Sequence, residues 1–188
     1  MDESKDPHQL DLVAQVTKAL VLYSLAEFQA GHASEIKVEA NGWAFGISDN
    51  GRGHSPSRLV AGSPYLQFVY SHLQYPFEGR TAGPVQLQGI GMSLLNSLCQ
   101  ELHVSSRRSE GGVRLTFVEG RHSNQEALPP GSEESGNTVS GTLRKALQSQ
   151  PTDAQAIEQW LSAVADTHPG LLLSFNGHRV GQASSSAA

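Results

Sequence analysis

Two glycine-rich segments contain the residues most suited to binding chemistry, and the first is Asp49-Asn50-Gly51-Arg52-Gly53. It follows a run with the alternation of a strand, and its glycines would let the backbone turn sharply and approach a ligand without a Cβ in the way. Continuing the alternation places the Asp49 carboxylate on the apolar side, where it is costly unless a donor hydrogen-bonds to it. The segment therefore predicts a site, although alone it also reads as an ordinary turn.

The second segment is Gln88-Gly89-Ile90-Gly91-Met92-Ser93, which runs directly into a predicted helix. Unpaired backbone N–H groups at a helix start favour an anion, and glycines leave room for phosphate oxygens to reach them. No Gly-Lys-Ser/Thr follows, so this is not a Walker A loop, and the spacing is not that of the dinucleotide fingerprint. The segment predicts an anion-binding turn of another type.

The elements that would position these segments begin with a long helix over roughly 7–30. Asp6 can cap it, Pro7 suits its first turn, and Gly31 ends it. Its predicted buried face recurs at every third or fourth residue and comprises Leu10, Val13, Val16, Leu20 and Tyr23.

A β-hairpin follows, with Asn41-Gly42 as its turn. Apolar residues alternate before the turn, at Ile36, Val38 and Ala40, and again after it, at Trp43, Phe45 and Ile47. We then expect a helix over 64–75, a loop to about 88, and a helix over 91–101 whose buried stripe is Leu95, Leu98, Cys99 and Leu102.

The remaining chain alternates between strands and helices. Strands are expected near 102–107, 113–119 and 139–145, with a mobile loop over 121–138. A capping box of Thr152 and Gln155 opens a helix with the stripe Ile157, Trp160, Leu161 and Val164, and 171–175 forms a last strand. This order predicts an α+β sandwich with one mostly antiparallel sheet and helices on one face.

Taken in order, the segments DNGRG, LQGIGMSLLNSLCQELHV and SGTLR resemble the ATP-binding domain of the DNA gyrase B protein and its topoisomerase relatives, which belong to the GHKL (Bergerat-fold) ATPase superfamily. The resemblance covers about residues 10–180 and implies a two-layer Bergerat fold. It implies one ATP-binding domain over 8–181, flanked by a flexible N-terminus, 1–7, and a disordered tail, 182–188.

The resemblance also implies roles for individual residues in binding ATP or ADP. Asp49 would accept a hydrogen bond from the adenine amino group, with Gly51 and Gly53 against the base. Thr142 would support the adenine through its hydroxyl and a bound water. Glu27 would form an ion pair with Arg52 at the edge of the pocket. The backbone of Gly89, Ile90 and Gly91 would surround the phosphates, and the following helix would place Ser93 and Asn96 behind them.

Two catalytic positions depart from the family pattern. Counting back from Ala30-Gly31-His32, the glutamate that activates water falls on Ala19, and the asparagine that ligates magnesium falls on Tyr23. Alanine has no base and a phenol is a poor magnesium ligand, so Mg²⁺ would lack its usual protein ligand. The 188 residues leave no room for the family's second domain, and 76–88, with Arg80, offers only a short lid. We therefore expect nucleotide binding with weak or no hydrolysis.

Two alternatives stay open at this stage. The chain could be an active topoisomerase-like or kinase-like ATPase in which His8 or His32 replaces the base. It could instead be a degenerate scaffold that no longer binds nucleotide, with Tyr23 filling the phosphate region and His54 beside the base.

The amino-acid composition limits the kinds of partner that the protein could bind. A formal net charge of −5 argues against a DNA-binding surface, and the single cysteine excludes an internal disulfide. The sequence contains no apolar run of membrane-spanning length, which predicts a cytoplasmic location. It identifies no protein partner and no oligomeric state.

Overall fold

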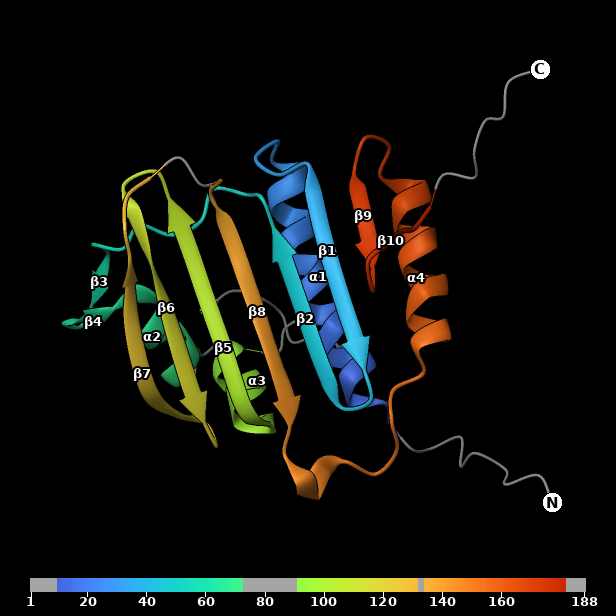
Figure 1. Cartoon of the computed structure of the whole chain (residues 1–188), viewed down its shortest axis with the longest axis horizontal. Coiled ribbons are helices and arrows are strands. Elements are labelled where there is room, and N and C mark those ends of the chain that lie inside the picture. The colour runs from blue at the N-terminus through green and yellow to red at the C-terminus, as the bar shows by residue number, and fades with distance from the viewer. Residues whose placement is uncertain (1–9, 73–90, 132–133, 182–188) are drawn as a thin grey trace, which may run out of the picture.

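The computed structural model describes residues 10–72, 91–131 and 134–181. Within these ranges eight strands form one sheet in the order β10-β9-β1-β2-β8-β5-β6-β7 (Figure 1). The strands are β1 (Glu35–Asn41), β2 (Ala44–Asp49), β5 (Cys99–Arg108), β6 (Gly111–Val118), β7 (Arg121–Leu128), β8 (Gly136–Leu143), β9 (Leu172–Phe175) and β10 (His178–Arg179). Neighbours are antiparallel except β1 and β9, and β3 (Leu59–Val60) pairs separately with β4 (Ser63–Pro64).

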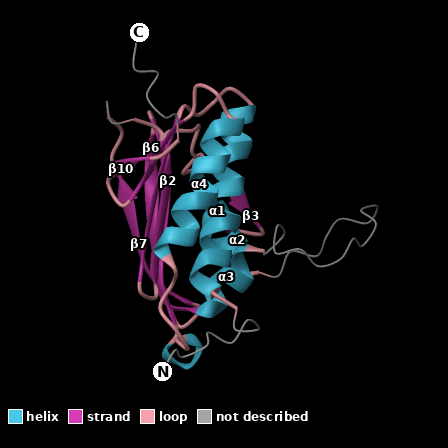
Figure 2. Cartoon of the chain, turned by 90° about the vertical axis from the view of Figure 1, so that its right-hand side faces the viewer, coloured by secondary structure: helices cyan, strands magenta, loops and turns pink. Residues whose placement is uncertain are grey.

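The helices form a second layer on one face of the sheet (Figure 2). They are α1 (Leu12–Gln29), α2 (Tyr65–Ser71), α3 (Met92–Leu98) and α4 (Ala154–Thr167), with a 3₁₀ turn at Lys145–Leu147. α1 packs on β1 and β2, α2 packs against α3, and α4 packs on β9. This is the predicted two-layer α+β sandwich with helices on one face.

The core lies between the two layers. The predicted hairpin forms, and Ile36, Val38, Phe45 and Ile47 are buried. Its turn is Gly42-Trp43 and not Asn41-Gly42, because Asn41 pairs with Ala44, and Gly42 adopts a φ of +59°. The largest fully buried side chains come from both layers and include Leu95, Leu102, Leu115, Phe117, Ile157, Leu161 and Leu173.

The first helix begins later than predicted. α1 starts at Leu12, and its cap is Asp11, whose Oδ1 accepts a hydrogen bond from the Ala14 N–H at 2.9 Å. Asp6 and Pro7 lie outside the described residues. Leu10 precedes the helix and is 50% exposed, and Tyr23 is 48% exposed, so the prediction that both belong to the buried face is wrong.

The helix expected over 91–101 ends at Leu98. From Cys99 onward the chain pairs with β6 on one side and β8 on the other, so the backbone groups of this segment are satisfied in the sheet. Leu102 and Cys99 are buried as predicted, but Leu102 belongs to β5 rather than to a helical stripe. Burial raises the pKa of the Cys99 thiol to about 12.

Two further predictions are wrong in the C-terminal half. The first eight residues of the expected loop over 121–138 form β7, an edge strand whose side chains are exposed along nearly its whole length, and β8 begins at Gly136. The helix α4 is capped by Asp153, not by Thr152 with Gln155, because the Thr152 hydroxyl donates to Asp11 Oδ2 at 2.8 Å. This contact ties the start of α4 to the start of α1.

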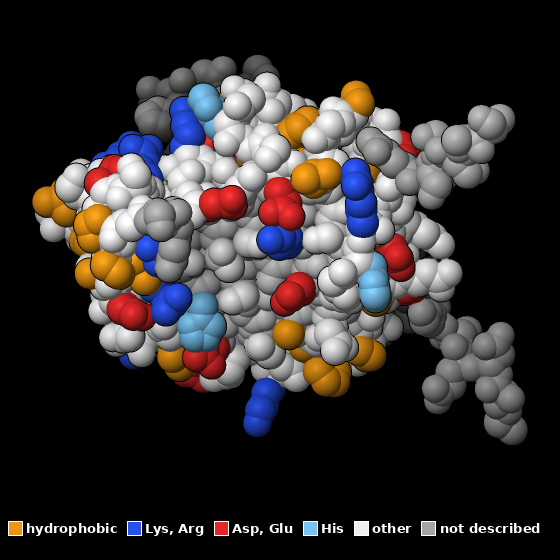
Figure 3. All heavy atoms as spheres, turned by 45° about the horizontal axis from the view of Figure 1, so that its top comes forward, with side chains coloured by type: hydrophobic (Ala, Val, Ile, Leu, Met, Phe, Trp, Pro, Cys, Tyr) orange, Lys and Arg blue, Asp and Glu red, His pale blue; other side chains and the backbone are white. Residues whose placement is uncertain are grey.

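Helices of the described ranges are too short or too polar to cross a membrane. The helix-free face of the sheet carries acidic and basic side chains close together (Figure 3). A polar cavity of about 290 Å³ includes Lys37, Ser48 and Thr138 in its lining. The predicted termini, 1–7 and 182–188, and the predicted start of the domain at 8 lie outside the described residues.

Candidate functional site

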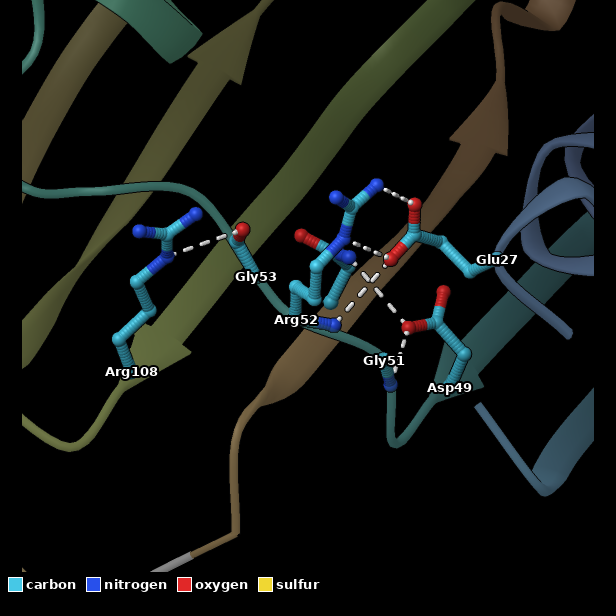
Figure 4. A network of polar contacts seen from close by, with 7 residues as sticks. Glu27, Asp49, Gly51, Arg52, Gly53 and Arg108 are labelled. Carbon is cyan, nitrogen blue, oxygen red and sulfur yellow. Dashed lines mark hydrogen bonds and ion pairs between the residues drawn. The ribbon is translucent and has the colours of Figure 1, made fainter. Parts of the chain in front are cut away.

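The Asp49 carboxylate at the end of β2 lies at the centre of the site. Its Oδ2 accepts a hydrogen bond from the Ser24 hydroxyl of α1 at 2.7 Å. Its Oδ1 accepts from the Gly51 N–H at 2.9 Å and from the Asn137 side-chain amide at 3.3 Å. The inward carboxylate predicted from the alternation of β2 therefore has its donors, and Figure 4 shows it beside Glu27 and Arg52.

The two glycines after Asp49 are required by close packing. A Cβ on Gly51 would lie 2.9 Å from Asp49 Oδ1 and 3.3 Å from the Glu27 Cβ. Gly53 has a φ of +65°, and a Cβ there would collide with the Arg107 carbonyl of β5. The Arg108 Nε–H donates to the Gly53 carbonyl at 3.2 Å, which fixes the loop against the end of β5.

Glu27 and Arg52 form the predicted ion pair. The Arg52 Nη2–H donates to Glu27 Oε1 at 2.7 Å, and the Arg52 Nε–H donates to Oε2 at 3.1 Å (Figure 4). The backbone N–H of Arg52 also reaches Oε2 at 3.3 Å. These hydrogen bonds from Arg52 lower the pKa of Glu27 to about 2.

A cavity of about 520 Å³ opens between the sheet and the helix layer beside Asp49. Ile47, Val104 and Val139 form its sheet side. α1 contributes Leu20, Tyr23, Ser24 and Glu27, and α2 with the start of α3 contributes Leu66, Val69, Tyr70, Gly91 and Met92. The volume and the mixture of apolar walls with a few polar groups are typical of a small-molecule site.

The structure brings most of the described predicted residues together. Glu27, Asp49, Arg52, Gly53 and Gly91 line the cavity, and Gly51 hydrogen-bonds to Asp49. Gly91 directly precedes α3, as predicted. Gly89 and Ile90 lie outside the described residues, as does the expected lid over 76–88 with Arg80.

Thr142 is the predicted residue that the structure places elsewhere. It is exposed and is absent from the residues that line the cavity. Gly141 beside it faces inward against Phe45 and Leu102, so the alternation of β8 turns Thr142 to the other face of the sheet. Asn137 of β8 instead lies opposite Asp49 in the β2–β8 register, and the prediction for Thr142 is corrected to this position.

Asn137 is held in one orientation by a chain of hydrogen bonds. The backbone N–H of His54 donates to the Ser106 hydroxyl at 2.7 Å, and that hydroxyl donates to Asn137 Oδ1 at 2.8 Å. Since Oδ1 is engaged by Ser106, Nδ2 faces Asp49. A sequence signal existed for Asn137, because Ser135-Gly136-Asn137 repeats the Ser-Gly-X order of Ser140-Gly141-Thr142.

Asn96 has a structural role in the described contacts. Its Nδ2 donates to the backbone carbonyls of Tyr70 at 2.9 Å and Gly120 at 3.0 Å, and the side chain is buried. These bonds join α3 to α2 and to the β6–β7 turn. Asn96 and Ser93 are absent from the residues that line the cavity.

Sequence reasoning missed two arginines of the cavity wall. Arg58 lies with its guanidinium 3.8 Å from the centre of the Tyr65 ring, and Arg108 reaches the Gly53 carbonyl. His54, predicted near the base, also lines the cavity, and its ring centre is 5.0 Å from that of Tyr65. Burial, followed by the charges of Arg58 and Arg108, lowers the pKa of His54.

The two departures from the catalytic pattern differ in their surroundings. Ala19 is buried in the core and does not line the cavity. Tyr23 does line it and is half exposed. Burial raises the pKa of Tyr23, so the group is a neutral phenol near neutral pH.

The cavity residues do not fit a magnesium ion. Magnesium prefers carboxylate and other hard oxygen ligands in octahedral geometry. The carboxylates in the described lining are Glu27, paired with Arg52, and Asp49, which accepts three hydrogen bonds. Across the described ranges, three or more acidic, histidine or cysteine side chains nowhere gather as a metal site.

Two solved structures are similar to the whole arrangement. The 43K ATPase domain of Thermus thermophilus gyrase B, solved with an aminocoumarin, is 25% identical with a TM-score of 0.69, covering 85% of this chain and 42% of that structure. The ATP-binding domain of Francisella tularensis topoisomerase IV, solved with a small-molecule inhibitor, is 18% identical with a TM-score of 0.70, covering 86% of this chain and 79% of that structure. The chain thus spans less than half of the gyrase B structure. No protein-family model and no curated protein matches the sequence.

The order of strands and helices, the Asp49 loop and the Glu27–Arg52 pair agree with the sequence resemblance, and the two solved structures extend that agreement over most of the chain. The chain has the Bergerat fold, the fold of the gyrase B and topoisomerase IV ATP-binding domains to which it is similar.

Proposed function

We propose that the chain binds an adenine nucleotide, ATP or ADP, in the cavity beside Asp49 and hydrolyses it weakly or not at all. The observation that carries the proposal is the Asp49 carboxylate, which three donors from separate segments hold at the wall of a 520 Å³ cavity. A carboxylate kept in this position is an acceptor for the exocyclic amino group of a purine.

The cavity matches the two parts of such a ligand. A flat base would lie against the apolar side chains of Ile47, Val104 and Val139, which burial favours. Its amino group would donate to Asp49 Oδ2, which accepts the Ser24 hydrogen bond and has a second lone pair. The phosphates would extend past α1 toward Gly91, where α3 begins.

We expect weak hydrolysis because Ala19 has no side-chain base. The position that the family uses for its general base holds a methyl group buried in the core, away from the cavity lining. Loss of a general base costs about 10²–10⁴-fold in rate. His32, the described histidine considered as a substitute, lies beyond the end of α1 and is absent from the cavity lining. A protein partner that senses the nucleotide-bound state would give such a domain a regulatory use.

Isothermal titration of the protein with ADP and ATP tests binding. We expect dissociation constants of about 1 µM or weaker for wild type, and loss of roughly 100-fold or more in Asp49→Asn, because the amide presents a donor to Ser24 and to the adenine amino group. Asp166→Asn, an exposed change on α4 far from the cavity lining, is the matched control and should bind as wild type does. Equal binding by Asp49→Asn, or no heat with wild type, contradicts the proposal.

A phosphate-release assay with ATP tests the second half of the proposal. We expect no release above the background of the Asp49→Asn variant. Turnover that this variant abolishes would show an active ATPase and would overturn the assignment of weak hydrolysis.

A further inference from the structure

The strand β7 forms one edge of the eight-stranded sheet, and the short strand β10 forms the other (Figure 1). Among the described strands only β6 pairs with β7, so the N–H and C=O groups along its other side are open to a further strand. Seven of its eight side chains, from Arg121 to Ala127, are exposed. This edge is therefore long and accessible on both faces, whereas β10 has two residues.

A β-bulge gives the side chains of β7 a symmetrical arrangement. Arg121, Asn124 and Glu126 lie opposite alternate residues of β6, because the bulge takes up Ser123 as an extra residue. These β6 residues point to the helix-free face, since their neighbours in the strand are buried in the core; they are Val118, Thr116 and Arg114. Residues opposite one another in a sheet share a face, so Arg121 and Glu126 stand on this face at equal distances from Asn124.

The two charged side chains have opposite signs and different surroundings. Glu126 Oε2 accepts a hydrogen bond from the Arg114 Nη1–H at 3.0 Å, and its second oxygen can accept from another donor. Arg121 forms no ion pair with a described residue. A two-fold axis through Asn124 would place Arg121 of one copy of the chain opposite Glu126 of a second copy, and the reverse pair would form as well.

An exposed apolar side chain lies near the same edge. The helix α2 contacts β7 and also contacts both strands of the β3–β4 hairpin. Leu59 of that hairpin is 61% exposed. The edge thus offers apolar surface for a second copy to cover, in addition to the open backbone groups.

We propose that two copies of the chain associate through β7, with the two β7 strands antiparallel about a two-fold axis through Asn124. The pairing joins the two sheets and forms two ion pairs, each between Arg121 of one copy and Glu126 of the other. This two-fold register sets both charged side chains opposite the other sign. Because β7 is polar and its bulge interrupts the hydrogen-bond ladder, the dimer is weak, with a dissociation constant of about 10–100 µM.

Sedimentation velocity of the full chain at low salt, over concentrations from about 5 µM to about 500 µM, tests the association. We expect a monomer at the lowest concentration and a dimer at the highest. Melting curves recorded at a few micromolar protein therefore report on the monomer. Wild type that stays monomeric at the highest concentration overturns the proposal.

Reversing one charge at a time tests the register. Arg121→Glu and Glu126→Arg each bring like charges together across the axis, so each should weaken dimerisation by about tenfold or more. An equimolar mixture of the two variants should dimerise again, because both contacts of the mixed pair join opposite charges. Arg179→Glu, a charge reversal on the exposed edge strand β10, is the matched control and should dimerise as wild type does. A dimer that survives both reversals, or a mixture that stays monomeric, overturns the proposal.

Asn124→Cys gives a second readout that does not depend on charge. At the axis the two introduced thiols face each other across a cross-strand Cα–Cα distance of about 4.5–5.5 Å, which a disulfide spans. With oxidised glutathione, at a concentration where wild type is a dimer, we expect a disulfide-linked dimer from Asn124→Cys and a much slower reaction from His178→Cys on β10. The native Cys99 is buried and does not compete.

Melting temperatures report whether each variant folds. If a charge variant does not fold, the comparison of Asn124→Cys with His178→Cys decides. Equal cross-linking of these two variants, or none from Asn124→Cys, contradicts the inference.

Discussion

Asp49, Glu27 and Arg52 show how single residues of the site depend on one another. The carboxylate of Asp49 is fixed by Ser24, Gly51 and Asn137, while the carboxylate of Glu27 accepts from both the side chain and the backbone of Arg52. Two carboxylates in one cavity are tolerated because each has its own donors. The position of Arg52 is in turn set by Gly51, where a side chain would meet both acids.

The Glu27–Arg52 pair makes stability depend on pH in a defined window. The pKa of Glu27 falls from its ordinary 4.5 to about 2 on folding, so the folded state favours the charged form. Its contribution is therefore fully present above about pH 4.5 and is lost as the pH falls toward 2. We expect wild type to melt above Glu27→Gln by a few degrees at most at pH 7, and this difference to disappear near pH 2.

Melting curves between pH 2 and pH 7 measure this difference. Glu126→Gln, which removes the partner of Arg114 in an exposed ion pair, serves as the control and should stay close to wild type. A difference between wild type and Glu27→Gln that grows as the pH falls would contradict the assigned direction of the pKa shift.

For single residues, the sequence predicts the position of a side chain well when neighbouring residues in the chain determine it. Asp49 follows from the alternation of one strand, and the Glu27–Arg52 pair from the family resemblance. The prediction for Thr142 was wrong because two Ser-Gly-X triplets occur within 135–142, and only the pairing of β8 with β2 distinguishes them. Asn137 becomes visible once that register sets it opposite Asp49.

Helices and strands were also predicted well where local sequence determines them, and poorly where pairing with distant segments does. The alternation of the β1–β2 hairpin was predicted well because it lies in thirteen consecutive residues, 36–48, while its turn falls one residue later than predicted. The end of α3 and the strand β7 were not, since Cys99–Arg108 and Arg121–Leu128 owe their extended form to partners distant in sequence. The apolar spacing of Leu95, Leu98, Cys99 and Leu102 fits a helix, but sheet pairing prevails after Leu98.

The start of α4 provides a test of local capping. Asp153→Ala should lower the free energy of unfolding by about 1 kcal/mol, because the Asp153 carboxylate accepts from the Ala156 N–H at 3.1 Å. Gln155→Ala should be nearly neutral, since Gln155 is exposed and the predicted capping box does not form. Urea denaturation of the two variants compares these values, and a larger loss for Gln155→Ala than for Asp153→Ala would restore the capping box.

For the molecule as a whole, the sheet forms one side of the site and the helix layer forms the other, and the departures from the family pattern lie in the helix layer. The pairing of β2, β5 and β8 fixes the positions of Asp49, Arg108 and Asn137 relative to one another. Both departures from the catalytic pattern, Ala19 and Tyr23, lie on α1. In the proposed function, the sheet carries the group that recognises the base, and the two departures that would weaken hydrolysis lie on α1.

A crystal structure of the protein with ADP tests the central claim most directly. We predict the adenine amino group within hydrogen-bond distance, about 2.8–3.2 Å, of the Asp49 carboxylate, with the base between the sheet and α1. ADP bound at another surface, or the base turned away from Asp49 in the occupied cavity, would contradict it.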